Sequence, residues 1–174
     1  MQKDMSAGLN LERLYDDHAQ ALFAFLLNFT RQEDLTREVL QEIFTRLARQ
    51  PQLLGGARDQ RAFLLRLAHN GAIDLLRRRS TRGKYHQQFG SAHPCPFAPD
   101  DDPDQQAFRK ALATALGTLP EDQRAVVHLK LWEDLTFEQI AETLQIPPNT
   151  AASRYRYGID KLRAQLRPLY DEIR

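Results

Sequence analysis

The most constraining stretch of this sequence is TFEQIAETLQIPPNTAASRYRYGIDKLRAQL, which runs from residue 136 to residue 166. Thr136 and Gln139 form a T-x-x-Q capping box, a pattern that predicts the start of a helix. Apolar residues follow at helical spacing until Pro147 and Pro148, because proline cannot continue a helix. Gln145 occupies the turn position where glycine is usual, at a cost of about 1 kcal/mol for a positive φ. We therefore predict two helices joined by a tight turn, a helix-turn-helix.

The second helix of this pair is predicted to begin near Asn149 and to have one buried and one exposed face. Its predicted buried residues are Ala151, Tyr155, Gly158, Ile159, Leu162 and Leu166. Small, polar and basic residues face outward near its start: Asn149, Thr150, Ala152, Ser153, Arg156 and Tyr157, with Arg154 at the edge. Such a surface suits the DNA major groove, where base edges and phosphates need donors. A helical hairpin in a bundle without nucleic acid is the alternative.

Three further helices are predicted in the first 80 residues, each with one apolar face. Thr30 and Glu33 form a second capping box, which places the start of the second helix, and the third is predicted from Gln60 to about Arg79. The inward residues are Leu11, Leu14, Tyr15, His18, Leu22, Phe25, Leu26 and Phe29; Leu35, Val39, Leu40, Ile43, Phe44 and Leu47; and Phe63, Leu64, Leu67, Ala68, Gly71 and Leu75. No stretch has the period of a β-strand, so this half is predicted to be all-α.

Residues 80–105 interrupt the helical pattern with four prolines and a run of aspartates, and they predict an extended linker. Helices are expected again from Ala107 to Leu116 and from about Pro120. The apolar side of the latter helix is predicted to contain Val126, Val127, Leu131, Trp132 and Leu135. The predicted fold class is all-α, with two small helical domains, 1–80 and 107–174, joined by a flexible, acidic and proline-rich linker at 81–106.

The formal charge is nearly balanced, with 24 basic and 23 acidic residues, so the whole chain carries no strong field toward a polyanion. Charge is nevertheless segregated, because residues 58–84 contain eight basic and two acidic side chains. The single cysteine fits a reducing compartment. No apolar run approaches the ~20 residues of a membrane span, and the N-terminus lacks the apolar core of a signal peptide. We expect a soluble, cytoplasmic protein.

Neither catalytic chemistry nor a cofactor is expected. His86, His93 and Cys95 lie close together, but a structural zinc site needs four ligands. The aspartates between residues 100 and 104 lack the glycine and the terminal glutamate of an EF-hand loop. The sequence contains no glycine-rich phosphate loop and no evident Ser/His/Asp set, so we expect no metal site and no enzyme.

Three motifs in this order resemble those of a bacterial RNA polymerase sigma factor of the extracytoplasmic-function (ECF) class, in the sigma-70 family. EVLQEIFTRLAR resembles the polymerase-clamp helix, QRAFLLRLAHNGAIDLLRRRS the promoter-melting helix, and LGTLPEDQRAVVHLKLWEDLTFEQIAETLQIPPNTAASR the region that reads the upstream promoter element. The resemblance implies sigma region 2, a linker and sigma region 4 in a dissociable subunit that directs promoter-specific initiation. The implied partners are the β′ clamp and β flap of core RNA polymerase, promoter DNA and an anti-sigma factor.

The resemblance also implies roles for individual residues. The polymerase-binding residues are Glu38, Gln41, Glu42 and Arg46. Those for the minus-ten element and its melting are Arg58, Arg61, Phe63, Arg66, Asn70, Asp74, Arg77 and Arg78. Those for the minus-thirty-five element are Asn149, Thr150, Ser153, Arg154 and Arg156. For Phe63, which replaces a usual tryptophan, plain core packing is an equally good interpretation, because phenylalanine has no polar group.

One departure concerns an acidic cluster, aspartate-alanine-glutamate-aspartate, that often precedes the clamp motif in this family. The aligned residues here are Leu35-Thr36-Arg37-Glu38, which keep one acid of three. Phosphorylation of Thr36 would add roughly −1.5 to −2 charges and is one hypothesis. Compensation by Glu33 and Asp34 is the favoured alternative.

Two other functions stay open at this point. The first is a stand-alone helix-turn-helix regulator that binds duplex DNA without polymerase, with the N-terminal half as a sensing or dimerising module. The second is a polymerase-binding protein that no longer recognises promoters. The clamp-like and melting-like helices favour the sigma factor, because a regulator has no use for an acidic surface that faces polymerase.

Overall fold

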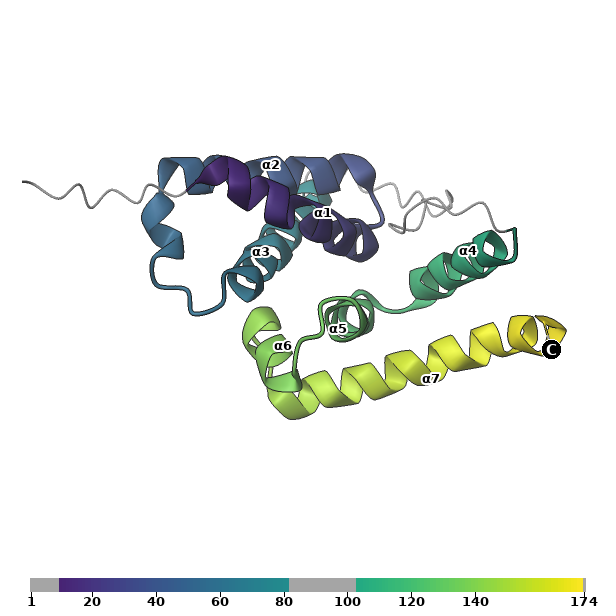
Figure 1. Cartoon of the computed structure of the whole chain (residues 1–174). Coiled ribbons are helices and arrows are strands. Elements are labelled where there is room, and N and C mark those ends of the chain that lie inside the picture. The colour runs from purple at the N-terminus through teal and green to yellow at the C-terminus, as the bar shows by residue number, and fades with distance from the viewer. Residues whose placement is uncertain (1–9, 82–102, 174) are drawn as a thin grey trace, which may run out of the picture.

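The computed structural model describes residues 10–81 and 103–173, and all regular structure in those two ranges is helical. The α-helices are α1 (Leu11–Thr30), α2 (Glu33–Arg49), α3 (Gln60–Thr81), α4 (Pro103–Thr118), α5 (Glu121–Leu131), α6 (Phe137–Leu144) and α7 (Pro148–Ile173), and a short 3-10 helix η1 spans Pro51–Leu54. In Figure 1, α1, α2 and α3 lie on one side, and α5, α6 and α7 on the other. The predicted all-α class is confirmed.

The helix-turn-helix forms as the sequence predicts. The Gln139 N–H donates to Thr136 Oγ1 at 3.2 Å, and the Thr136 N–H donates to Gln139 Oε1 at 2.8 Å, so the capping box is complete. Gln145 ends α6 with a φ of 55°, the left-handed turn that the sequence requires of it. The second helix of the pair, α7, begins at Pro148, one residue before the predicted start.

The second predicted capping box is wrong. Thr30 is the last residue of α1, and Arg31 follows it with a φ of 58°. The N-cap of α2 is Gln32, whose side chain makes no capping bond. The Thr30 hydroxyl instead lies 3.0 Å from the Thr36 hydroxyl and 3.2 Å from the Gln32 carbonyl oxygen. Thr30 thus stabilises the α1–α2 turn and does not cap the start of α2.

Several burial predictions are wrong, and in α3 the buried face differs because this helix contacts α1, α2 and α6. The buried residues of α3 are Leu64, Leu65, Ala68, Ala72 and Leu75, whereas Phe63, Leu67 and Gly71 are only half-buried. Leu131 is 49% exposed at the end of α5, not inward. Tyr15 is 50% exposed, although its ring lies 4.9 Å from that of Phe44. α4 begins at Pro103, inside the predicted linker, whereas residues 82–102, with His86, His93 and Cys95, lie outside the described residues.

The two predicted helical units pack on one another. α1 contacts α5, and α3 contacts α6, and one apolar core contains Phe25 and Leu26 of α1 together with Val126 of α5 and Ile140 of α6. Every residue from Phe25 to Thr30 is buried, because the end of α1 is covered on all sides. α4 joins through a smaller cluster with α5 and α7. The interface therefore includes α3, the helix that carries most of the residues predicted to bind the minus-ten element.

Candidate functional site

The four predicted polymerase-binding residues share one face of α2. Gln41 and Glu42 follow Glu38 by three and four positions, and Arg46 follows Glu42 by four, so the helix places all four on one side. The same four residues line a shallow surface hollow together with Thr45, Arg49 and Gln50. All four residues are exposed, and their two carboxylates have the charge that a basic partner surface requires.

Two arginines at the end of α3 pair with these carboxylates. Arg79 Nη2 donates to Glu38 Oε2 at 2.6 Å, and Arg78 Nη2 lies 3.8 Å from Glu42 Oε1. The sequence predicted Arg78 for DNA and gave Arg79 no role. These pairs depend on how α3 crosses α2, where Gly71 lies against Val39. No short-range sequence pattern predicts that crossing.

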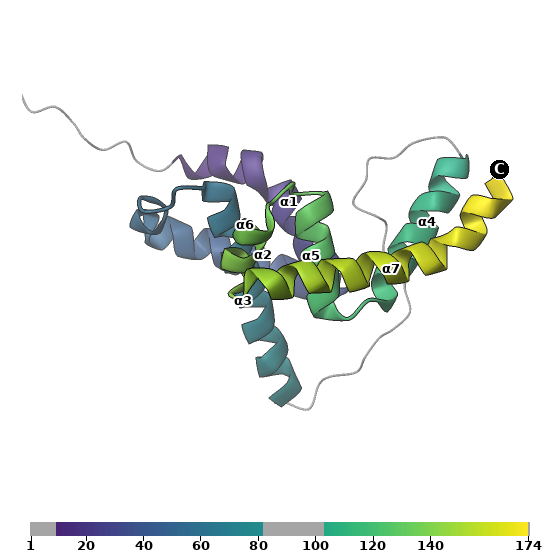
Figure 2. The ribbon, with the colours of Figure 1, turned by 90° about the horizontal axis from the view of Figure 1, so that it is seen from below.

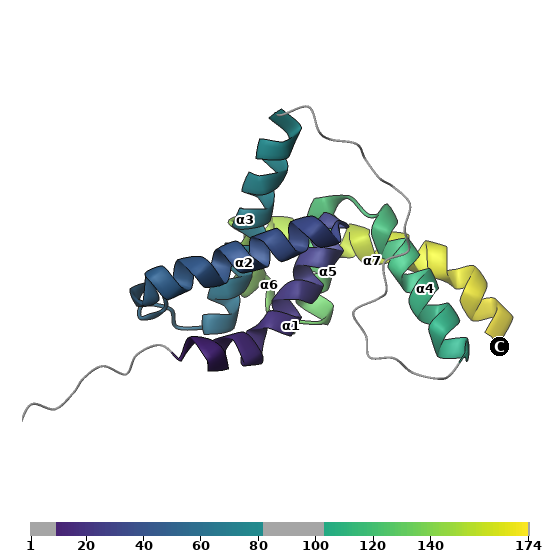
Figure 3. The same cartoon turned by 90° about the horizontal axis from the view of Figure 1, so that it is seen from above.

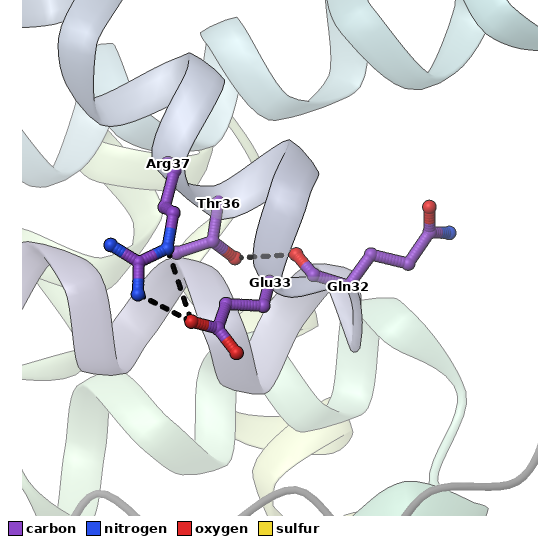
Figure 4. A network of polar contacts seen from close by, with 4 residues as sticks. All are labelled: Gln32, Glu33, Thr36 and Arg37. Atoms are coloured by element: carbon purple, nitrogen blue, oxygen red, sulfur yellow. Dashed lines mark hydrogen bonds and ion pairs between the residues drawn. The ribbon is translucent and has the colours of Figure 1, made fainter.

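The structure gives Thr36 a structural role. Its side chain is buried, and its hydroxyl donates to the carbonyl oxygen of Gln32 at 2.9 Å (Figure 4). A kinase would have to unwind this turn to reach the hydroxyl, so the burial argues against the phosphorylation hypothesis. Figure 4 also shows Glu33 paired with Arg37, the base that replaces a family acid, at an Nε–Oε1 distance of 3.0 Å. Glu33 therefore neutralises Arg37 and adds no net charge at this point.

The predicted minus-ten residues are spread along α3 rather than gathered at one point. Arg61 and Arg78 are about 25 Å apart at 1.5 Å per residue. Arg58, Arg61, Asp74, Arg77 and Arg78 are exposed, and Phe63, Arg66 and Asn70 are half-buried. The Arg66 guanidinium lies over the Phe63 ring at 5.2 Å, which holds both side chains at the surface of the helix. The set, called the α3 strip here, is elongated and mainly basic, which suits a nucleic-acid backbone; Phe63 lies near the start of α3 and Asn70 near its middle.

A buried polar network joins the start of α3 to the other helical unit, and sequence reasoning missed it. Arg61 Nε donates to Glu133 Oε2 at 2.6 Å, and the Glu133 side chain is only 4% exposed. Glu133 also faces His128 Nε2 at 3.6 Å, and Asn28 Nδ2 donates to His128 Nδ1 at 2.9 Å. Burial raises the pKa of the Glu133 carboxyl. The facing His128 ring and the Arg61 charge together lower that pKa by more than burial raises it, so it lies below its ordinary value.

A second arginine crosses the same interface. Arg124 of α5 is buried, and its Nη2 donates to the carbonyl oxygen of Phe29 at 3.0 Å. Its Nη1 lies 3.3 Å from the carbonyl oxygens of Gly117 and Leu119. A guanidinium at the carbonyl end of α1 is favourable, because the end of a helix carries partial negative charge. The sequence signal for this contact was the position of Arg124 directly before the apolar residues Ala125, Val126 and Val127.

The start of α7 combines engaged and available side chains. Arg154 Nε lies 3.0 Å from Asp122 Oδ2, and the Ser153 hydroxyl donates to the Asn149 carbonyl oxygen at 2.8 Å. Asn149 is exposed and Thr150 is half-buried. Arg156 is exposed, with its guanidinium 5.2 Å from the centre of the Tyr157 ring. The structure thus brings the five predicted minus-thirty-five residues to one helix end, with Arg156 the most accessible of its charges.

His69 of α3 lies near both helical units. Its ring centre is 5.2 Å from that of Phe29. Burial lowers the pKa of His69 and the Arg154 charge lowers it further, whereas a hydrogen bond to Asn70 raises it; the net result is below the ordinary value. The imidazole is therefore neutral at physiological pH, and it lies within electrostatic reach of a residue predicted to contact DNA.

Within residues 10–81 and 103–173, no group of three or more His, Cys, Asp or Glu side chains is arranged to hold a metal ion. In the same ranges, no helix combines the length and the apolar character that crossing a bilayer requires.

Comparisons with known proteins agree on one family. Residues 14–82 match Sigma-70 region 2, and residues 109–162 match Sigma-70, region 4. The chain is 32% identical over 163 residues to the ECF RNA polymerase sigma factor SigL of Mycobacterium tuberculosis, a match that covers 91% of this chain and 90% of SigL. It is also 32% identical over 163 residues to the RNA polymerase sigma factor CarQ of Myxococcus xanthus, covering 93% and 92% of the two chains.

The fold has a counterpart among solved structures. The sigma factor RpoE from Bartonella quintana, solved in complex with the anti-sigma factor NepR, superposes with a TM-score of 0.73 at 19% identity. The match covers 91% of this chain and 97% of that one.

Proposed function

This chain belongs to the sigma-70 family as an ECF sigma factor, a subunit that directs promoter-specific transcription initiation, and from that premise we propose which of its surfaces meets polymerase and which meets DNA. The family models match both helical units, and the sigma-factor relatives SigL and CarQ align along more than nine-tenths of the chain. A stand-alone regulator is therefore not favoured. We assign residues 1–80 to region 2, 81–106 to the linker and 107–174 to region 4.

The α2 face carries the proposal for polymerase. Glu38, Gln41, Glu42 and Arg46 line one hollow, which gives a basic partner surface two carboxylates and an amide within a few turns of helix. The single observation that supports this assignment is their convergence on that hollow. The β′ clamp is the proposed partner there, and the β flap is the proposed partner of region 4.

We assign the α3 strip to the minus-ten element and the start of α7 to the minus-thirty-five element. Phosphates favour the arginines, and Asn70 and Arg156 have the donors that base edges require. Two elements about 25 base pairs apart are separated by roughly 85 Å at 3.4 Å per pair. In this structure α3 contacts α6 directly, so the chain has to open before both elements are bound. A segment of the length of 82–102 reaches at most roughly 76 Å when fully extended, which allows wide separation of the two units.

The factor acts by binding and supplies no chemistry of its own, since polymerase carries the reaction. Its proposed localisation is the cytoplasm, where polymerase binds the chromosome. The structural relative from Bartonella quintana was solved with an anti-sigma factor, and a partner of that kind is our proposal for restraint of this chain.

The test is binding to core polymerase on a sizing column. Wild type is expected to co-elute with bacterial core, and Gln41→Ala/Glu42→Ala is expected to lose most of that binding. The matched control is Glu12→Ala/Gln20→Ala, which changes the same residue types at exposed positions of α1. Loss of binding in both double variants would contradict the assignment of the α2 face. Absence of core binding by wild type, with tight binding to duplex DNA, would favour the stand-alone regulator.

A further inference from the structure

Two arginines at the end of α3 link the surface assigned to polymerase with the surface assigned to DNA. Arg79 pairs with Glu38 at 2.6 Å, and Arg78 lies 3.8 Å from Glu42. The two carboxylates are four positions apart, on the same face of α2. Each of them faces a guanidinium in the free chain.

The pairs lie at the surface, where partners can exchange. Arg78 and Glu42 are 56% and 55% exposed, and Arg79 and Glu38 are 35% and 51% exposed. Figures 2 and 3 show that the C-terminal half of α3 projects from the helical body, so a nucleic acid can approach it from outside. Exposed ion pairs contribute little stability, so a competing charged group can displace either partner at small cost.

We propose that Arg78 and Arg79 couple polymerase binding to DNA binding by exchanging ion-pair partners. In the free chain they neutralise Glu38 and Glu42. A basic polymerase surface that takes these carboxylates releases the guanidiniums for nucleic-acid phosphates. The coupling is reciprocal, so DNA that takes the arginines also frees the carboxylates for polymerase. The inference rests on the proposed polymerase and DNA surfaces.

The size of the effect follows from the exposure of the pairs. An exposed pair contributes at most a factor of about five to an equilibrium constant. Each partner is therefore expected to tighten binding of the other by about two- to fivefold through these arginines. Removal of a carboxylate should mimic polymerase, and removal of an arginine should mimic DNA.

The first arm uses the free, full-length chain and no polymerase. Anisotropy of a fluorescein-labelled single-stranded dT20 measures whether the arginines become available. Glu38→Gln/Glu42→Gln is expected to bind dT20 about two- to fivefold more tightly than Glu12→Gln/Asp16→Asn, a control with the same charge change on exposed residues of α1. Equal affinities for the two double variants would mean that only net charge matters, and would overturn the inference.

The second arm measures the affinity of Arg78→Gln/Arg79→Gln for core polymerase. The exchange predicts about two- to fivefold tighter binding than for Arg13→Gln/Arg163→Gln, which removes two exposed arginines from other ion pairs. Arginines that only position the carboxylates would give weaker binding, so weaker or unchanged affinity overturns the inference. If wild type bound no core, the proposed function would fail, and the dT20 comparison would still decide whether the carboxylates restrain the arginines.

Discussion

Arg61 and Glu133 are 72 positions apart in sequence, and their side chains form a hydrogen-bonded ion pair of 2.6 Å between the two helical units. The carboxylate is buried and the guanidinium is 44% exposed, so the pair sits at the rim of the interface. Arg61 is also assigned to the minus-ten backbone. Packing of region 4 on region 2 and binding of DNA phosphate therefore compete for the same guanidinium.

Substitution Glu133→Gln is expected to loosen this packing by about 1–3 kcal/mol, because it removes the charge that pairs with Arg61. Trp132 is the single tryptophan of the sequence, and it stacks on His128 at 5.2 Å beside the interface. Its emission during urea titration reports the separation of the two units. The variant should reach the red-shifted state at lower urea than wild type.

Asp134→Asn is the matched control for this substitution. Asp134 is exposed, adjacent in sequence and has a φ of 57°, a conformation that asparagine also tolerates. If Glu133→Gln and Asp134→Asn shifted the Trp132 transition equally, the ion pair would make no measurable contribution to the packing.

Acidification is expected to destabilise the chain in two separate windows. The pKa of His69 is lowered in the folded state, so the unfolded chain binds the extra proton first and stability is lost as pH falls below about 6.5. The pKa of Glu133 is also lowered, so its contribution is present above its unfolded value and is lost as pH falls further.

Urea denaturation at pH 5.5 and 7.5, at one ionic strength, separates the first window from the second. Wild type should lose stability between these values, by at most about 1.4 kcal/mol per pH unit from one group. His69→Gln should lose less. An identical pH dependence in the two proteins would show that His69 does not carry the effect.

Local signals in the sequence predicted local structure well. The Thr136–Gln139 box and the left-handed Gln145 depend on a few adjacent residues, so they survive in any packing. The exposed face of α2 follows from helical periodicity alone. The Thr30–Glu33 box was wrong because Arg31, the first helical residue after a Thr30 cap, is left-handed, and α2 begins only at Glu33.

Contacts between the helical units could not be predicted in this way. Asn28 and His128 are 100 positions apart, and nothing near either residue identifies its partner. The same holds for Arg78 and Arg79, whose pairing requires the crossing of α2 and α3 to be known. The residues of the candidate surfaces could thus be predicted from sequence. The ion pairs and hydrogen bonds that join these surfaces could not, because they depend on tertiary packing.

Thr36→Asp is expected to destabilise the chain by roughly 2–4 kcal/mol, because it buries a charge where a hydroxyl was hydrogen-bonded. Thermal unfolding measures the loss. Thr45→Asp on the exposed face of the same helix provides the control and should leave the midpoint nearly unchanged. A Thr36→Asp protein as stable as the control would reopen the phosphorylation hypothesis, and intact-mass measurement of native protein would then decide it.

Gly158→Ala is expected to destabilise region 4 by about 1–2 kcal/mol. A Cβ at this position would lie 2.7 Å from Val127 Cγ2, and valine has little rotamer freedom in a helix. This overpacking outweighs the gain of about 1 kcal/mol that alanine brings to a helix interior. Chemical denaturation measures the change. When Val127 is already alanine, adding Gly158→Ala should cost less stability than it costs in the wild-type chain. Additive losses in the double variant would exclude the steric explanation.

Arg156→Ala and Arg154→Ala are expected to have different effects, although both arginines lie at the start of α7. Arg156 is exposed over Tyr157, so its loss should weaken holoenzyme binding to the upstream element by about 1–3 kcal/mol and relax base preference at one position. Arg154 pairs with Asp122, so its loss should act mainly on region 4 stability and leave base preference unchanged. Sequencing of duplexes that each holoenzyme enriches from a randomised pool measures the preference. If Arg154→Ala lost base preference at one position and Arg156→Ala kept the wild-type preference, base reading would be assigned to Arg154.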